Sequence, residues 1–199
     1  MNRNMKQMWD KRYAEDEYAY GIHPNIFFKK KIKGVEPAKI LLPAEGEGRN
    51  AVYAAGLGWD VYAFDFSAKA REKALLLSEE KNVSIQYAVH NIEEAEYELS
   101  SFEMMALIYA HNPKRKENHQ HLLWFLKPGG TVILEGFSKE QIKNNAAGPK
   151  DINMLYSIKE LKEDFSQLSE LDVWEEDIML DEGEFHSGKS SVIRLIGKK

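Results

Sequence analysis

Short apolar runs alternate with amphipathic stretches along most of this 199-residue chain. Most of the runs are short enough for strands, and helical spacing of apolar residues follows several of them. This alternation is typical of an α/β fold, in which parallel strands are buried under helices on both faces. The predicted strands are 40–42, 60–64, 83–89, 104–109 and 131–135, and the predicted helices are 49–57, 68–81, 114–126 and 158–165.

The end of the chain follows a different pattern. Residues 171–180 and 190–196 alternate apolar and polar positions around Asp181-Glu-Gly183, which predicts an antiparallel hairpin. The expected architecture is a doubly wound, Rossmann-like α/β sheet with helices on both faces and a C-terminal antiparallel β-hairpin. We expect one domain over residues 1–199, with an N-terminal helical lid segment over 1–36 and the Rossmann-like core over 37–199.

A glycine turn separates the first predicted strand from its helix. Gly46 and Gly48 allow the backbone to pass close to a ligand, where a Cβ atom would collide with it. The second strand ends on Asp65, 17 residues after Gly48 (65 minus 48), and a carboxylate there can accept hydrogen bonds from both ribose hydroxyls. The pattern predicts a βαβ unit that binds an adenosine-type cofactor.

The charges around this turn distinguish two cofactor classes. Gly46, Gly48 and Ala51 also satisfy the G-x-G-x-x-A pattern, so an NAD(P)-dependent oxidoreductase is one alternative. Glu45 and Glu47 flank Gly46 and would repel a pyrophosphate, whereas the cationic cofactor S-adenosylmethionine carries no phosphate. In the other interpretation, both glutamates are solvated turn residues that only add negative charge at the start of the helix.

The amino-acid composition limits the classes of molecule that the protein is expected to bind. The formal charge is −5 and the isoelectric point is about 5.8, so we expect a small-molecule substrate and no binding to nucleic acid or to a membrane. The chain has no cysteine, and we expect no metal site. No signal peptide or apolar run long enough to cross a membrane is found, which predicts a cytoplasmic protein. We expect a monomer or a homodimer.

Several segments together resemble class I S-adenosylmethionine-dependent methyltransferases, in particular the tellurite-resistance (TehB-like) and thiopurine methyltransferase-like group. The resemblance implies a seven-stranded sheet, S-adenosyl-L-methionine as cofactor and S-adenosyl-L-homocysteine as product. It also implies a small-molecule acceptor, for which a thiol, a chalcogen oxyanion or a chalcogenide is the first expectation. The matching segments are WDKRY at 9–13, YGIHPN at 20–25, EGEGRN at 45–50, DFS at 65–67, LKPGG at 126–130, LEGF at 134–137, GPK at 148–150, MLYS at 154–157 and DEGEFHSGK at 181–189.

The resemblance also implies where the cofactor binds. Arg12 and Tyr20, in the lid segment, are expected to hold the cofactor carboxylate, next to aromatic side chains that favour a sulfonium. In the core, the expected cofactor-binding residues are Glu45, Gly46, Gly48, Asn50, Asp65, Phe66, Asn91 and Ile92. Asn91 stands where the group usually has Asp, and its side-chain oxygen can still accept a hydrogen bond from the adenine amino group.

One departure from the group precedes the glycines. The group usually has an acidic residue and a first glycine there, whereas this chain has Leu42-Pro-Ala44. Glu45 is a candidate substitute for the acidic residue. The departure keeps a second alternative open, namely a protein that binds S-adenosylmethionine without catalysing a transfer.

Methyl transfer depends more on the alignment of the two reactants than on acid or base catalysis. A soft nucleophile, such as a thiolate, needs no dedicated base. His111, just after the fourth predicted strand, and His186, in the loop of the terminal hairpin, are the candidates for a base or for substrate positioning. The alternative for each is a hydrogen-bonded loop histidine without a catalytic role.

Overall fold

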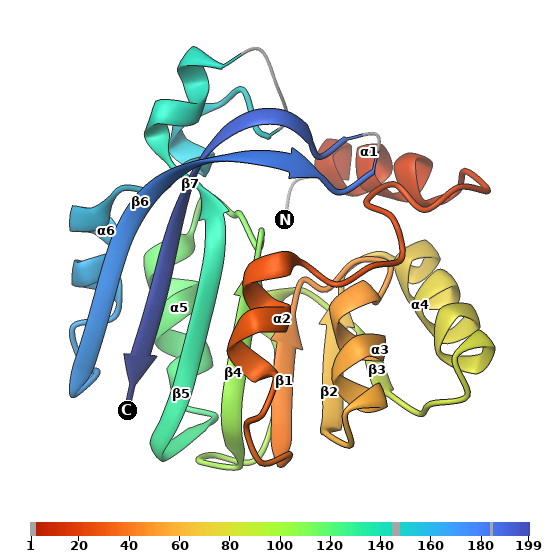
Figure 1. The fold of residues 1–199 in the computed structure, drawn as a ribbon, viewed down its shortest axis with the longest axis horizontal. Coiled ribbons are helices and arrows are strands. Elements are labelled where there is room, and N and C mark those ends of the chain that lie inside the picture. Colours follow the sequence, from red (N-terminus) through yellow and green to blue (C-terminus); the bar gives the residue numbers. More distant parts are fainter. Residues whose placement is uncertain (1–2, 145–147, 184) are drawn as a thin grey trace.

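Seven strands form one mixed sheet in the order β3-β2-β1-β4-β5-β7-β6. The computed structural model describes residues 3–144, 148–183 and 185–199. The strands are β1 (Lys39–Pro43), β2 (Asp60–Asp65), β3 (Gln86–Val89), β4 (Phe102–Ile108), β5 (Leu126–Phe137), β6 (Glu170–Asp181) and β7 (Ser187–Lys198). Strands β1 to β5 are parallel, and β7 pairs antiparallel with both β5 and β6. The predicted doubly wound sheet with a terminal antiparallel hairpin is confirmed (Figure 1).

Helices pack on both faces of the sheet because the central strands are apolar on both sides. In β1, Ile40 and Leu42 belong to one core cluster and Leu41 belongs to the other. The α-helices are α1 (Arg3–Tyr13), α2 (Ile26–Ile32), α3 (Arg49–Gly56), α4 (Ala68–Glu80), α5 (Arg115–Leu123) and α6 (Ile158–Asp164). Helices α2, α3 and α4 contribute to the first cluster, and α5 and α6 contribute to the second. Short 3₁₀ helices are η1 (Ile92–Glu94), η2 (Lys139–Lys143) and η3 (Ile152–Met154).

Element boundaries depart from the predictions where pairing in the sheet decides them. Helix α5 ends at Leu123 rather than Leu126, because Leu126 pairs with Phe102 at the start of β5. Residues 127–130 form an irregular part of β5, where the register with β4 shifts. Helix α2 was not predicted, since its seven residues are too few to show a helical period.

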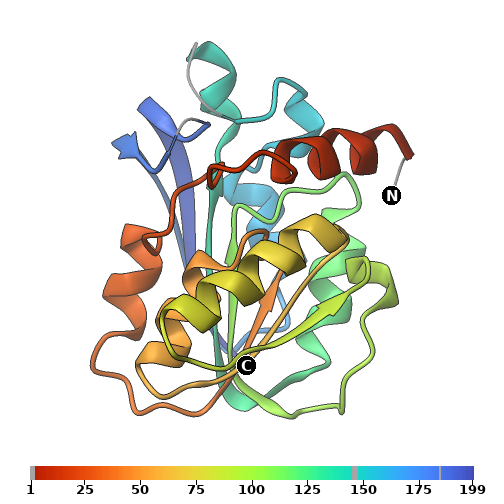
Figure 2. The ribbon, with the colours of Figure 1, turned by 90° about the vertical axis from the view of Figure 1, so that its right-hand side faces the viewer.

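Two segments far apart in the sequence lie together above the sheet. Helix α1 crosses over the ends of the parallel strands, and the hairpin of β6 and β7 curves toward it (Figures 1 and 2). At the hairpin tip, a Cβ atom on Gly183 would lie 2.8 Å from the backbone nitrogen of Gly21. The terminal hairpin and the predicted lid segment are thus in direct backbone contact. Residues 1–2 of that segment and Glu184 of the hairpin motif lie outside the described residues.

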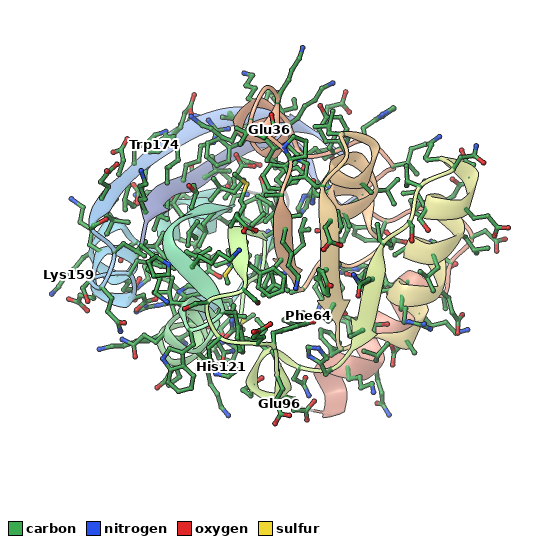
Figure 3. All side chains as sticks on the ribbon, turned by 90° about the horizontal axis from the view of Figure 1, so that it is seen from below. Glu36, Phe64, Glu96, His121, Lys159 and Trp174 are labelled. Carbon is green, nitrogen blue, oxygen red and sulfur yellow. The ribbon has the colours of Figure 1, made fainter. Side chains whose placement is uncertain are left out.

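Charged side chains dominate the periphery. Seen from below, Glu36, Glu96 and Lys159 lie at the edge of the molecule, and Phe64, which is buried, lies farther in (Figure 3). Among the described residues, none of the helices combines the length and the apolar composition needed to span a lipid bilayer. The described part of the chain also contains no group of three or more histidine, aspartate or glutamate side chains that could hold a metal ion.

Candidate functional site

A cavity of about 850 Å³ lies at the carboxyl ends of the parallel strands. Open α/β sheets bind ligands at this edge, because the loops that follow the strands diverge there. Helix α1 and the hairpin tip contribute further walls. Of the twelve residues predicted for the site, eleven line the cavity: Arg12, Tyr20, Glu45, Gly46, Asn50, Asp65, Phe66, Asn91, Ile92, His111 and His186.

Gly48 is the exception, and its role is one of packing. It is not among the cavity-lining residues. Its φ angle is +85°, and a Cβ atom there would lie 2.6 Å from the Cβ atom of Ala74. The absence of a side chain at Gly48 therefore brings α3 against α4, whereas Gly46, with a φ of +61°, lies on the cavity wall.

Glu45 caps helix α3 from within the turn. One carboxylate oxygen accepts hydrogen bonds from the backbone N–H groups of Asn50 and Ala51, both at 2.8 Å. The other accepts a bond from the Asn50 side chain at 3.3 Å. Glu47 is also buried, and its carboxylate pairs with Lys73 Nζ at 2.6 Å. The interpretation of both glutamates as solvated turn residues is therefore wrong, and Glu47 does not line the cavity.

This arrangement excludes a pyrophosphate more directly than charge repulsion does. In dinucleotide-binding proteins, the free N–H groups at the start of the helix bind the phosphates. Here Glu45 already accepts hydrogen bonds from two of these groups. A phosphate would have to displace a buried carboxylate, so the site is unsuited to NAD(P).

Glu45 should make stability depend on pH near neutrality. Burial raises its pKa to about 7, against the hydrogen bonds from Ala51 and Asn50. The pKa of Glu45 is higher in the folded than in the unfolded protein, so protonated Glu45 favours the folded state. This contribution to the free energy of unfolding is fully present below the pKa of the unfolded protein and is lost as pH rises through 7. In urea unfolding from pH 5 to 8, wild type should lose stability relative to Glu45→Gln as pH rises. Glu96→Gln, which changes an exposed carboxylate, is the control, and a constant difference between wild type and Glu45→Gln would contradict the prediction.

Asp65 ends β2 with its carboxylate at the cavity wall. Its oxygens accept hydrogen bonds from the backbone N–H groups of Ser67, at 2.9 Å, and Gly46, at 3.2 Å. Burial raises the pKa of Asp65 to about 6, and the negative charge of Asp10 acts in the same direction. The two backbone hydrogen bonds act in the opposite direction. Each carboxylate oxygen has a further lone pair, so the group can accept bonds from a bound diol.

The loops after β2 and β3 provide a mixed apolar and amide wall. Phe66 and Ile92 supply the apolar part. The backbone and side-chain nitrogens of Asn91 both donate to the Glu94 carboxylate, at 3.0 and 3.1 Å. This contact fixes the orientation of the Asn91 amide, whose oxygen has two lone pairs and can accept a hydrogen bond from a ligand. This wall can hold a flat, apolar ring that carries an amino group.

Helix α1 places a guanidinium among aromatic rings over the cavity. Arg12 lies 4.6 Å from the ring centre of Trp9 and 4.3 Å from that of Phe185, and it donates to the Tyr20 hydroxyl at 2.7 Å. Asp10 on the same helix accepts a hydrogen bond from Ser67 Oγ at 2.5 Å. The segment thus closes over the site, with a cation that can bind a carboxylate.

The two histidines differ in the state of their ring nitrogens. His111 Nδ1 lies 2.6 Å from the Met154 carbonyl oxygen, and Nε2 accepts from the Phe137 N–H at 3.0 Å. With both nitrogens bonded to backbone, and with burial lowering its pKa to about 3, His111 is unsuited to act as a base. Of the two interpretations of His111, the structure favours the hydrogen-bonded loop histidine.

His186 is less constrained. Its Nδ1 lies 3.5 Å from a carboxylate oxygen of Glu182, and its ring packs against those of Tyr20 and Tyr109 at 4.4 and 4.3 Å. Burial lowers its pKa, although Glu182 acts in the opposite direction. The lowered pKa favours the neutral form of the imidazole, which can accept a hydrogen bond.

Sequence reasoning missed several residues of the cavity wall. Tyr109 and Ala44 both line it with positive φ angles, of 55° and 52°, which are unusual for residues other than glycine. Ala44 thus adopts a left-handed conformation, which glycine adopts more easily. Phe137 and Met154 also line the wall. The position of Tyr109 directly after an apolar strand was the available signal.

Residues 40–130 match the sequence profile of a family described as a methyltransferase domain. The protein is an S-adenosylmethionine-dependent methyltransferase. The match begins in β1 and ends in β5, so it includes the glycine turn and Asp65. The cofactor is S-adenosylmethionine, in agreement with the resemblance, and the oxidoreductase alternative is not favoured. No protein of curated function matches the sequence.

Solved structures resemble the methyltransferase over most of its length. A protein studied in the conversion of a disulfide bond into a thioacetal group during echinomycin biosynthesis has a TM-score of 0.74 and 15% identity, with 98% of this chain and 92% of that chain covered. TehB from Haemophilus influenzae has a TM-score of 0.68 and 17% identity, and the match covers 98% of this chain and 66% of TehB.

A third structure contains the product of the cofactor. It is phosphoethanolamine N-methyltransferase 2 from Haemonchus contortus, in complex with phosphomonomethylethanolamine and S-adenosylhomocysteine, with a TM-score of 0.72, 17% identity and 98% and 58% of the chains covered. At these identities the three structures establish the fold of the methyltransferase and leave its acceptor undetermined.

Proposed function

We propose that this methyltransferase acts on a small acceptor with a soft nucleophilic atom, such as a thiol, a chalcogen oxyanion or a chalcogenide. The supporting observation is that burial disfavours proton uptake at both His111 and His186. Both ring nitrogens of His111 are bonded to backbone, and burial lowers the pKa of His186. Burial also raises the pKa of Tyr109 well above its ordinary value. Such a site suits an acceptor that loses its proton easily.

In this proposal the cofactor occupies the half of the cavity at β1 and β2. Asp65 accepts hydrogen bonds from the ribose hydroxyls, and the wall formed by Phe66, Asn91 and Ile92 encloses the adenine. When bound, S-adenosylmethionine supplies a methyl group on a positively charged sulfur. Arg12 and Tyr20 hold the carboxylate of the cofactor, and the aromatic rings of the lid favour the positive charge.

The residues at the other half align the acceptor and exclude water. Phe137, Phe185, Tyr109 and His186 surround this half with rings, and helix α1 covers it. Alignment of two reactants can lower a barrier by roughly 7 to 11 kcal/mol, which leaves little for a base to contribute. His186 accepts a hydrogen bond from an acceptor that still carries its proton, such as the S–H group of a thiol, and so orients the acceptor atom.

The solved structures offer two acceptor classes for comparison. One concerns sulfur chemistry, the conversion of a disulfide into a thioacetal, and another binds a phosphorylated amine. An amine is protonated at neutral pH and must lose a proton before it attacks the methyl group. The weak bases described above favour the sulfur class for this protein.

An acceptor panel tests the proposal. The purified protein is incubated with S-adenosylmethionine and with small thiols, selenite, tellurite, primary amines or phenols, and S-adenosylhomocysteine formation is measured. We expect turnover with thiols or chalcogen compounds, with none above background for amines and phenols. Turnover restricted to amines or phenols would overturn the proposed acceptor class. A variant with Asp65→Asn is the control for turnover that depends on the cofactor.

A further inference from the structure

Two buried carboxylates lie directly behind the acceptor half of the cavity. Glu135 on β5 is 1% exposed, and Glu182, which follows β6, is 8% exposed. Neither lines the cavity, yet each approaches a residue that does: the Tyr109 hydroxyl donates to Glu135 at 3.1 Å, and His186 Nδ1 lies 3.5 Å from Glu182. Removing a carboxylate from water is costly unless its partners replace that water.

Both carboxylates are held by the same amide and by separate guanidinium groups. The Asn25 side-chain nitrogen donates to Glu135 at 2.6 Å and to Glu182 at 3.0 Å. Arg194 donates to Glu135 at 2.6 Å, and Arg49 donates to Glu182 at 2.8 Å. The two negative charges are thus matched by two positive ones, and each carboxylate has a fixed orientation. A carboxylate held in this way can orient a third group without moving itself.

The turn at the hairpin tip brings Glu182 beside His186. The Glu182 N–H donates to the His186 carbonyl at 2.8 Å, and the His186 N–H donates to the Gly183 carbonyl at 3.2 Å. His186 Nδ1 is buried and makes no hydrogen bond to the described residues. The Glu182 carboxylate oxygen at 3.5 Å is the only oxygen with which the described structure pairs it. A buried N–H group gains stability from such an acceptor.

We propose that Glu182 is a positioning residue for His186: its carboxylate accepts the Nδ1 hydrogen and leaves Nε2 free to accept a hydrogen bond from the methyl acceptor. The contact with the acceptor rests on the proposed function, whereas the orientation of the ring does not. Fixing one ring nitrogen determines which tautomer is present and how the ring is oriented. The titratable and charged groups that face the ring are Arg12, Tyr20, Arg49, Tyr109, His111 and Glu182.

Nitrogen NMR of the full chain labelled with ¹⁵N-histidine tests the orientation without any acceptor. In the presence of S-adenosylhomocysteine, the signals assigned to His186 by their loss in His186→Gln should show a proton on Nδ1 and none on Nε2. In Glu182→Gln, the pKa of His186 should fall further, by one pH unit or more, because the imidazolium loses its carboxylate and keeps two nearby guanidinium groups. A wild-type proton on Nε2, or an unchanged pKa in the variant, would overturn the proposal.

Glu135→Gln is the matched control, because it removes an equally buried carboxylate that shares the Asn25 amide. It should lower stability and leave the tautomer and pKa of His186 unchanged. If both variants changed His186 alike, a general loss of packing would be the cause and the proposal would fail.

Kinetics with an acceptor that turns over provide a second test. In Glu182→Gln, kcat should fall about 10-fold, and the KM for S-adenosylmethionine should be unchanged. In the double variant, Glu182→Gln should add nothing to the effect of His186→Gln. Failure of the thiol panel would leave the NMR result intact, so the two proposals fail separately.

Discussion

Gly48→Ala should destabilise the protein by about 2 to 5 kcal/mol. The added Cβ atom would lie 2.6 Å from the Cβ and 2.9 Å from the Cα atom of Ala74, so α3 or α4 must move. Overpacking of this kind costs about 1 to 3 kcal/mol, and a left-handed conformation, here with a φ of +85°, costs a non-glycine residue about 1 to 2 kcal/mol. Urea unfolding monitored by circular dichroism measures the sum.

Gly56→Ala is the matched control, because it makes the same substitution at the other end of the same helix. A Cβ atom there meets nothing within 4 Å, and its φ is not in the left-handed region. This change should stabilise the protein by about 0.5 to 1 kcal/mol, through the helix propensity of alanine. Adding Ala74→Gly to Gly48→Ala should recover only part of the loss, since the steric clash with the backbone of α4 and the strained φ remain. Equal stability of Gly48→Ala and wild type would show that α3 and α4 do not approach each other this closely.

Asp65→Asn should weaken binding of both S-adenosylmethionine and S-adenosylhomocysteine roughly 100-fold or more. Hydrogen bonds to a charged group contribute about 1.5 to 3 kcal/mol each, and the carboxylate is proposed to accept two from the ribose. The amide nitrogen of asparagine would also face the backbone N–H of either Gly46 or Ser67, so the loop loses a bond as well. Calorimetric titration of the folded variant measures the change.

Asp60→Asn is the control, since it alters an exposed carboxylate at the opposite end of the same strand. Its affinity should equal that of wild type. A folded Asp65→Asn protein that binds either ligand as tightly as wild type would remove the assignment of the ribose to this residue.

The pH dependence of wild-type binding follows from the same carboxylate. Burial and the charge of Asp10 raise the pKa of Asp65 to about 6 in the free protein. If the ionised form binds the ribose, a proton must leave before binding when the pH is below 6, so affinity should fall as pH decreases through that value. The Asp65→Asn variant has no such group and should lack this dependence. Titrations at pH 5, 6, 7 and 8 compare the two proteins.

The local pattern of the sequence determined most of the architecture. Apolar runs with helical stretches between them predicted the parallel strands, and the alternation of apolar and polar positions after residue 170 predicted the hairpin of β6 and β7. Helix caps are equally local: Ser67 accepts from the Ala70 N–H, and Ser157 forms a capping box with Glu160. Asp65 was found because a strand end, a glycine turn and a carboxylate occur at a recognisable spacing. Such features depend on neighbours in the chain, so sequence alone contains them.

The tertiary structure decided which partner each polar group takes. Glu45 was expected to act on the ligand through its charge, but it caps α3; His111 was a candidate base, but both of its ring nitrogens bond to backbone. Glu182 was not predicted as a site residue, because its partner Asn25 is 157 residues away. Periodicity reports which face of an element is buried, whereas a hydrogen bond depends on two atoms brought within about 3 Å by the whole fold. For this reason the sequence determined the sheet and predicted most of the residues that line the cavity, and only the folded chain determined which groups surround His186.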